Sequence, residues 1–257
     1  MNWTLLLDGA HPGWHNMAVD SALLDLADRE GTAFLRLYRW EPFCLSFGRH
    51  EPASRRYDRS RIAELGLDCV RRPTGGRAVW HARELTYAVA APLAEFGGLR
   101  EAYHRIHSLI ALAIRSLGIE PDLAPSSARA AHPSAGPCFA TPVGGEILVR
   151  GRKLVGSAQL RQGNAFLQHG SLLLDDNQSL PRSLAGLDPD EEAEVPLAQL
   201  SGRPVSFEEV ACAVIQVAHS RLTPQAGKLE RKLPEAVLPG VEQHAARFQD
   251  PAWTWQR

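Results

Sequence analysis

The sequence predicts an α+β fold, in which a mixed, largely antiparallel sheet is flanked by helices. Strand-like and helical stretches are dispersed among one another along the 257 residues. Several strand-like stretches also follow each other through very short links, which antiparallel neighbours allow and parallel neighbours do not. A chain of this length is at the upper end of what one domain holds, so we expect a single domain over residues 1–257.

The first elements along the chain are predicted to be a helix and a hairpin. Asn16 is placed to cap the helix, and Gly31 is placed to end it in a left-handed conformation. Residues 33–39 and 43–47 are apolar and aromatic-rich, which is typical of strands. The Glu41-Pro42 pair between them has turn chemistry, so we expect these two strands to pair with each other.

The remaining elements follow from apolar periodicity and from turn residues. Helices are expected at residues 54–65, at 99–117, and from the capping box that begins at Ser206 to about 222; strands are expected at 68–72, 85–92, 146–150, 153–159 and 166–174. Residues 124–137 are nearly all small or polar, and we expect a surface loop that ends at Cys138. The segment after about residue 223 is rich in Pro, Lys and Glu, and we expect a loosely packed tail.

Charge and composition exclude several classes of protein. The chain has 28 basic and 29 acidic residues, a balance that gives no broad electrostatic footprint for nucleic acid or an anionic membrane. It contains no secretion signal and no apolar run of about eighteen residues, so we expect a cytoplasmic protein without a membrane span. The four cysteines are scattered and predict neither a disulfide framework nor a metal site. Three of them, Cys44, Cys69 and Cys212, are expected to be core residues.

A glycine turn is the first motif that can carry chemistry. Gly75 and Gly76 follow a predicted strand, and adjacent glycines let the backbone approach a ligand closely and present its amides. A simple hairpin turn is the alternative, because the phosphate-loop and dinucleotide fingerprints are both absent. The flanking arginines and His81 favour a functional turn.

Cys138 is the second candidate. It follows the small-residue loop and stands between Pro137 and Phe139, so loop opening would expose it. A cysteine attacks a thioester only when it is accessible and a nearby cation stabilises its thiolate. A structural cysteine is the alternative.

The third candidate begins at Lys153, which opens an apolar strand. Gly156, Ser157 and Ala158 remove side-chain bulk from consecutive positions, which suits either tight strand packing or an alkyl chain lying on the backbone. A surface lysine in a hairpin is the alternative for Lys153. His169, in the next strand, is expected to be a buried, hydrogen-bonded histidine rather than a proton shuttle.

These segments, in this order, resemble the biotin/lipoate protein ligase superfamily. Within it they are most similar to the octanoyl-[acyl-carrier-protein]:protein N-octanoyltransferases of the cysteine/lysine type. The similarity extends from Asn16 to about Asp175. The matching segments are Arg71-Arg72-Pro73-Thr74-Gly75-Gly76-Arg77-Ala78-Val79, Glu84-Leu85-Thr86-Tyr87, Cys138-Phe139, Gly151-Arg152-Lys153, Gly156-Ser157-Ala158-Gln159 and Gln168-His169-Gly170-Ser171.

The resemblance implies the superfamily's catalytic-domain fold and a transferase that needs no metal or other cofactor. Octanoyl-acyl-carrier protein would donate the acyl group to Cys138, with Lys153 as the second catalytic residue. The acceptor would be a lysine of a lipoyl domain, such as that of the glycine-cleavage carrier protein or of a 2-oxoacid dehydrogenase acyltransferase subunit. The enzyme is expected to be a monomer. The implied substrate-binding residues are Arg72, Thr74, Gly75, Gly76, Arg77, His81, Gly156, Ser157, Ala158, His169 and Gly170.

Two alternatives stay open. An ATP-dependent lipoate ligase would use the same glycine turn with magnesium, but such ligases usually carry a third glycine at Arg77 and an Asn-Asp pair at Gly145-Glu146. A non-catalytic binder of lipoyl domains or acyl carriers is supported only by Ala82, where the family often has an aspartate after the histidine. That carboxylate would serve acceptor docking or polar support of His81.

Overall fold

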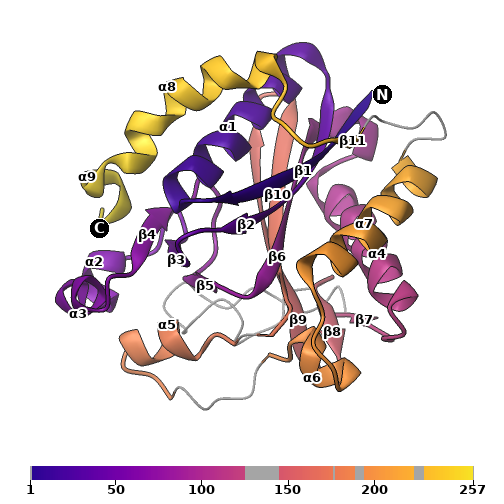
Figure 1. The fold of residues 1–257 in the computed structure, drawn as a ribbon. Helices are drawn as coiled ribbons and strands as arrows, with labels where there is room; N and C mark the ends of the chain where they lie inside the picture. Colours follow the sequence, from indigo (N-terminus) through magenta and orange to yellow (C-terminus); the bar gives the residue numbers. More distant parts are fainter. Residues whose placement is uncertain (1, 125–144, 176, 189–193, 223–228, 257) are drawn as a thin grey trace.

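A computed structural model describes residues 2–124, 145–175, 177–188, 194–222 and 229–256 (Figure 1). Its main feature is a large mixed sheet with the strand order β11-β1-β2-β6-β10-β9-β8-β7. In that order the strands are Leu229–Glu230, Trp3–His11, Ala33–Trp40, Glu84–Pro92, Ala165–Leu173, Arg152–Gln162, Ile147–Val149 and Asp122–Leu123. The pairs β11/β1 and β1/β2 are parallel and the remaining neighbours are antiparallel, which confirms the predicted fold class.

A smaller sheet contains β4 (Asp68–Arg71), β3 (Cys44–Phe47) and β5 (Val79–His81) in that order. The predicted hairpin between residues 33–39 and 43–47, which correspond to β2 and β3, is therefore wrong. Both edges of β2 are taken, by β1 and β6, so the chain leaves the large sheet after Trp40 and β3 starts the small one. The turn residues at 41–42 change the chain direction, but they do not decide which strands pair.

Helices cover both faces of the large sheet (Figure 1). On one face α1 (Gly13–Glu30) packs against α8 (Leu238–Gln249), and on the other α4 (Leu99–Ser116) packs against α7 (Phe207–Leu222). The shorter helical elements are α2 (Ala53–Arg56), α3 (Arg59–Glu64), α5 (Ser179–Leu184), α6 (Leu197–Ser201), α9 (Pro251–Thr254), η1 (Leu93–Phe96) and η2 (Glu235–Val237). In the part of the chain that is described, no helix combines the length and the apolar character that crossing a membrane requires.

The helix ends test the capping predictions. Gly31 ends α1 with φ 70°, and the Ser206 hydroxyl accepts the Glu209 backbone N–H at 3.1 Å, as predicted. Asn16, however, does not cap α1, which starts at Gly13. Its buried amide instead donates to the carbonyls of His11 and Arg39, and so joins the helix to β1 and β2.

The helix expected over residues 54–65 is divided into α2 and α3. Tyr57 between them has an extended backbone, and the Asp58 side chain caps α3 by accepting the Arg61 N–H. A cap residue supplies the acceptor that the first turn lacks, so Asp58 favours a new helix start over a continuous helix.

The expectation of a loosely packed tail is wrong for the described residues after 228. Val237, Val241 and Phe248 are buried between α8 and α1. The Trp253 indole donates to the Arg71 carbonyl, and the buried Arg71 guanidinium donates to the carbonyls of Trp253, Thr254 and Gln256. A few well-spaced apolar residues anchor this segment, although its composition is dominated by Pro, Lys and Glu.

Candidate active site

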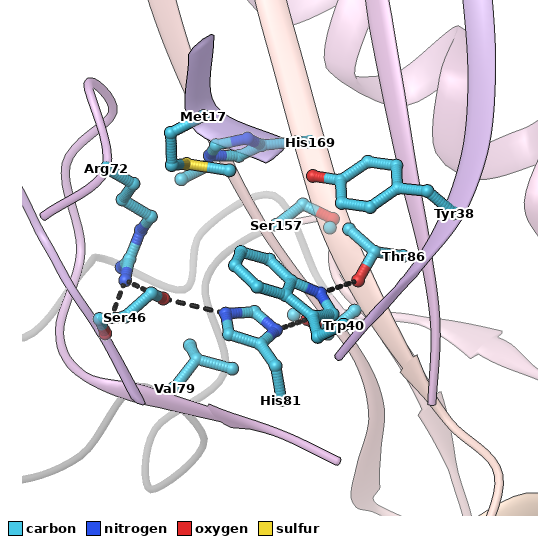
Figure 2. A pocket seen from close by; sticks show the side chains of 14 residues that line it. Met17, Tyr38, Trp40, Ser46, Arg72, Val79, His81, Thr86, Ser157 and His169 are labelled. Carbon is cyan, nitrogen blue, oxygen red and sulfur yellow. Dashed lines mark hydrogen bonds between the residues drawn. The ribbon is translucent and has the colours of Figure 1, made fainter. Parts of the chain in front are cut away.

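A pocket lies where the small sheet meets the central strands of the large sheet (Figure 2). Its exposed lining is almost entirely apolar. It is lined by Met17, Tyr38, Trp40, Ser46, Arg72, Val79, His81, Thr86, Gly156, Ser157, Ala158, His169, Gly170 and Ser171. The structure thus brings most of the predicted substrate-binding residues together, from segments that are far apart in the sequence.

Arg72 holds the glycine turn in shape. Its guanidinium is buried, donates to the carbonyls of Gly75 (2.9 Å) and Arg77 (2.6 Å), and reaches the Ser46 carbonyl at 3.1 Å. Gly76 has φ 88°, a left-handed conformation that favours glycine. Four predicted substrate-binding residues do not line the pocket, namely Thr74, Gly75, Gly76 and Arg77, but Arg72 ties the turn to the pocket wall.

Gly48, which the sequence reading missed, lies against this turn. A Cβ atom at Gly48 would lie 1.8 Å from the Gly76 carbonyl oxygen, a distance that no side chain can accept. The Arg49 backbone N–H also donates to the Thr74 carbonyl at 2.8 Å. The close approach therefore requires glycine on the β3 side as well as in the turn itself.

Thr74 is linked to the helix face by a chain of buried hydrogen bonds. The Thr74 hydroxyl is 2.6 Å from His169 Nε2, and His169 Nδ1 is 2.9 Å from Asp20 Oδ2. Asp20 also accepts from Arg36 and from the Tyr38 hydroxyl, each at 2.9 Å. Burial lowers the pKa of His169 and so favours the neutral ring. This is the hydrogen-bonded histidine that the sequence predicted.

Lys153 is buried, so the alternative of a surface lysine is wrong. Its Nζ donates to Glu146 Oε1 at 2.6 Å, and both side chains are almost fully enclosed. Ile147 pairs with Val155 whereas Leu148 pairs with Lys153, so β9 carries an extra residue at Leu154. A bulge of this kind alters the alternation of side chains and is common beside active sites.

Glu146 was therefore missed as a site residue. In the sequence, Gly145-Glu146 is a departure from the ligases, but in the structure Glu146 is the ion-pair partner of Lys153 across the β8–β9 turn. A carboxylate seven positions before a lysine, with the glycine-containing turn between them, was the available signal.

Cys138 lies outside the described residues. The other thiols can be placed. Burial raises the pKa of Cys69 to about 12 and raises that of Cys44 well above its ordinary value, which makes both poor nucleophiles. Cys212 is exposed on α7, so its assignment to the core is wrong.

His107 supports the strand that carries Lys153 from the side of α4. Its Nδ1 donates to the Gly145 carbonyl at 2.6 Å, and its Nε2 lies 2.8 Å from the Ser157 hydroxyl. Burial, followed by the Lys153 charge, lowers the pKa of His107 to about 4. The neutral ring therefore connects the start of β8 to the small-residue segment of β9.

His81 is held by a carboxylate and a hydroxyl. Its Nδ1 is 2.7 Å from Glu84 Oε1. Its Nε2 is 2.7 Å from Ser46 Oγ (Figure 2). The Trp40 ring stacks on it, with centroids 4.0 Å apart and an interplanar angle of 16°. Polar support of His81 thus comes from Glu84, and Ala82 does not deprive the histidine of a carboxylate.

No cluster of three or more His, Cys, Asp or Glu side chains suited to a metal ion occurs among the described residues. The residues that line the pocket and were not predicted are Met17, Tyr38, Trp40, Ser46, Val79, Thr86 and Ser171. Val79, Thr86 and Ser171 stand in the motif segments of the resemblance, whereas only the three-dimensional arrangement distinguishes Met17, Tyr38, Trp40 and Ser46 from ordinary core residues.

Comparison with known proteins gives the family. The model of the lipoyl protein ligase A/B catalytic domain matches residues 12–218. Octanoyltransferase LipM of Kyrpidia tusciae is 35% identical over 277 residues, which cover 99% of this chain and 99% of the relative. Octanoyltransferase LipM of Moorella thermoacetica is 43% identical over 183 residues, which cover 68% and 66%.

Solved structures share the fold. A lipoate-protein ligase A bound with ATP has a TM-score of 0.81 at 19% identity and covers 99% of both chains. A bipartite lipoate protein ligase from Thermoplasma acidophilum, solved in a study of the ligase and its E2 lipoyl domain, has a TM-score of 0.74 at 18% identity and covers 100% of this chain and 98% of that one. The family match, the full-length relative and the shared fold agree: the chain belongs to the lipoyl protein ligase A/B catalytic-domain family, within the superfamily that its motifs predict.

Proposed function

We propose that this protein transfers an octanoyl group from octanoyl-acyl-carrier protein to the lysine of a lipoyl domain, through a thioester at Cys138. The observation that carries the proposal is the 35% identity to an octanoyltransferase over 99% of both chains. The ATP-bound ligase is only 19% identical, a similarity that speaks for the fold and not for the reaction.

The pocket suits the acyl chain. Its exposed lining is almost entirely apolar, as is usual for sites that bind an alkyl chain. Burial of an octanoyl chain at about 0.8 kcal/mol per methylene supplies about 5 kcal/mol for binding. Gly156 and Ala158 keep the β9 wall free of large side chains, so the chain can lie against the backbone.

Cys138 and Lys153 carry the chemistry. The Cys138 thiolate attacks the thioester carbonyl, and the carrier's thiol leaves, so the acyl group is now on the enzyme. The acceptor amine then attacks this thioester, loses a proton and displaces the Cys138 thiol. The Lys153 ammonium stabilises the thiolate, and as a neutral amine it accepts the proton of the incoming lysine.

The reaction needs no ATP, metal or other cofactor. Exchange of one thioester for another is nearly neutral in energy, and conversion of a thioester to an amide runs downhill. Placement and electrostatic stabilisation are then sufficient, with backbone amides near Gly75-Gly76 or Ser157-Ala158 as the donors to the oxyanion. The glycine-cleavage carrier protein and the acyltransferase subunits of 2-oxoacid dehydrogenases are the expected acceptors.

A reconstituted transfer assay tests the proposal. Purified protein, octanoyl-acyl-carrier protein and an apo lipoyl domain are mixed, and the mass of the lipoyl domain is followed. We expect one octanoyl group on the domain with wild-type protein, and a loss of at least about 1,000-fold for Cys138→Ser and Lys153→Met. Transfer by Cys138→Ser at the wild-type rate contradicts the mechanism. Modification with lipoate, ATP and magnesium in place of the octanoyl donor would instead identify a ligase.

A further inference from the structure

The pocket holds a second group of residues with the geometry of a nucleophile, a base and an orienting carboxylate. We propose that Ser46, His81 and Glu84 form a serine acyl-transfer site, in which Ser46 accepts an acyl group from a thioester or activated ester and releases it to water. The three residues come from β3, β5 and the start of β6, and the mechanism above uses none of them as a reacting group.

The distances are those of a triad. Ser46 Oγ is 2.7 Å from His81 Nε2, and His81 Nδ1 is 2.7 Å from Glu84 Oε1. An ionised carboxylate only accepts hydrogen bonds, so Nδ1 carries the ring proton and Nε2 accepts from the serine hydroxyl. This tautomer is the one in which histidine can take the proton of the nucleophile.

The carboxylate and the ring are fixed in place. Glu84 Oε1 also accepts from the hydroxyls of Thr86 and Ser171, and Trp40 stacks on the imidazole. Within the described part of the chain, Glu84 Oε2 is buried and has no hydrogen-bond partner. The negative charge of Glu84 is thus held beside a ring that becomes positive when His81 takes a proton, which is the role of the third triad member.

Arg72 supplies a fixed positive charge beside Ser46. Its Nη1 donates to Ser46 Oγ at 3.0 Å, so the guanidinium lies beside the position where a tetrahedral intermediate would form. A fixed cation at this position stabilises the oxyanion that develops on the carbonyl. Ser46, Arg72 and His81 all line the apolar pocket, and the Ser46 side chain is buried there, so an acyl group must enter the pocket to reach it (Figure 2).

The steps balance without any further reagent than water. Ser46 Oγ attacks the acyl carbonyl and its proton passes to His81 Nε2. The carbon–sulfur bond breaks, and His81 returns the proton to the leaving thiolate. Water then attacks the serine ester with the same base, which gives the free carboxylic acid and restores the Ser46 hydroxyl. The product is the free fatty acid of the acyl chain that the pocket holds.

This inference rests on the proposed function only for the identity of the acyl chain. A cysteine route through Cys138 and a serine route through Ser46 use different nucleophiles, so each can fail without the other. The test is therefore done with the full-length Cys138→Ala protein beside the wild type.

An octyl fluorophosphonate is the probe, because it forms a stable phosphorus–oxygen bond with an activated serine and releases fluoride. Peptide mapping by mass spectrometry is expected to find the adduct on Ser46 in both the wild type and Cys138→Ala. Labelling is expected to fall at least about 100-fold in His81→Asn and about 10-fold or more in Glu84→Gln. No adduct on Ser46 of the wild type, or an adduct whose rate is the same in both variants, would overturn the proposal.

Ser220→Ala is the matched control. Ser220 is exposed on α7, where its hydroxyl donates to the Val217 carbonyl at 2.9 Å, and it is not one of the residues that line the pocket. Its removal leaves the contacts among Ser46, His81 and Glu84 in place, so the Ser46 adduct is expected to persist. Release of octanoate from octanoyl-coenzyme A by Cys138→Ala, lost when Ser46→Ala is added, is the expected turnover. A Ser46 adduct without octanoate release would overturn the hydrolytic step.

Discussion

Lys153 serves both the proposed chemistry and the stability of the surrounding fold. Its ammonium is enclosed with the Glu146 carboxylate at 2.6 Å, a contact that the sequence did not reveal. Removing one partner of a buried ion pair leaves the other charge without that compensation and is strongly destabilising. The pair therefore fixes the position of the amine that the reaction needs.

Glu146→Ala is expected to lower the free energy of unfolding by about 3 kcal/mol, as buried ion pairs do when one member is lost. Urea denaturation followed by tryptophan fluorescence measures the change. Glu146→Gln, which keeps the shape and one acceptor, should lose less. Equal stability of the alanine variant and the wild type would show that Glu146 is not a supporting partner of Lys153.

The titration of His107 determines in which direction the free energy of unfolding changes with pH. Burial lowers its pKa from the ordinary 6.5 to about 4, so between these values the unfolded chain binds a proton that the folded protein does not. The lowered pKa of His107 leaves the free energy of unfolding unaffected by this group above pH 6.5. As the pH falls from 6.5 toward 4, the free energy of unfolding decreases by about 3 kcal/mol in total.

His107→Gln removes this titration. We expect the difference in unfolding free energy between wild type and His107→Gln to shrink as the pH falls from 6.5 to 4, and to be constant above pH 7. Other groups whose pKa is lowered, such as His169, titrate in both proteins, so their contributions cancel in the difference. A difference that does not depend on pH would contradict the assignment.

At the scale of elements, the site depends on how closely β3 approaches the glycine turn. Gly48 follows β3 and leaves no room for a side chain beside Gly76. Arg72 fixes the same turn from the other side through the carbonyls of Gly75 and Arg77. The small sheet thus supports the turn, and β3 belongs to it because both edges of β2 are taken by β1 and β6.

Gly48→Ala is expected to displace the turn and to reduce octanoyl transfer by about 10-fold or more, since displacement of a site by about 1 Å can cost 100-fold. It should also lower stability by about 1–3 kcal/mol, as overpacking does. Gly75→Ala is the comparison for the steric effect, because a Cβ there meets no atom within 4 Å. We expect its thermal midpoint to stay near that of the wild type. Equal midpoints for both variants would argue against the close approach.

At the scale of the whole molecule, the last residues of the chain are part of the support for the site. Arg71 ends β4 directly before Arg72, and its guanidinium is buried among the carbonyls of Trp253, Thr254 and Gln256. Phe248 packs α8 onto α1, whose residues Met17 and Asp20 reach the pocket and its hydrogen-bond network.

Phe248→Ala is expected to cost about 3–5 kcal/mol of stability, the usual range for a buried phenylalanine. Thermal unfolding measures the loss, and exposed Phe43→Ala serves as the comparison, with little expected change. A small effect of Phe248→Ala would restore the expectation of a loosely packed tail.

The sequence predicted the fold class and most elements because apolar periodicity and caps are local properties. These local signals predicted helices and strands close to those of the structure, namely β6, β9, β10, α1, α4 and α7. Pairing is not local, so the separation of β3 from β2 was not predicted. The same holds for the site: His169 and the small residues of β9 stand out in a motif, whereas Ser46 gains its role only from a partner 35 residues away on another strand. Glu146 lies seven positions before Lys153, a local signal that the sequence did offer.

The central claim is that Cys138 carries the octanoyl group. Intact-mass spectrometry of the protein after mixing with octanoyl-acyl-carrier protein tests it most directly. We predict one added octanoyl group, mapped to Cys138 and removed by neutral hydroxylamine, with no such labile adduct on Cys138→Ala. A wild-type protein that modifies the lipoyl domain while Cys138 never carries the acyl group would contradict the account.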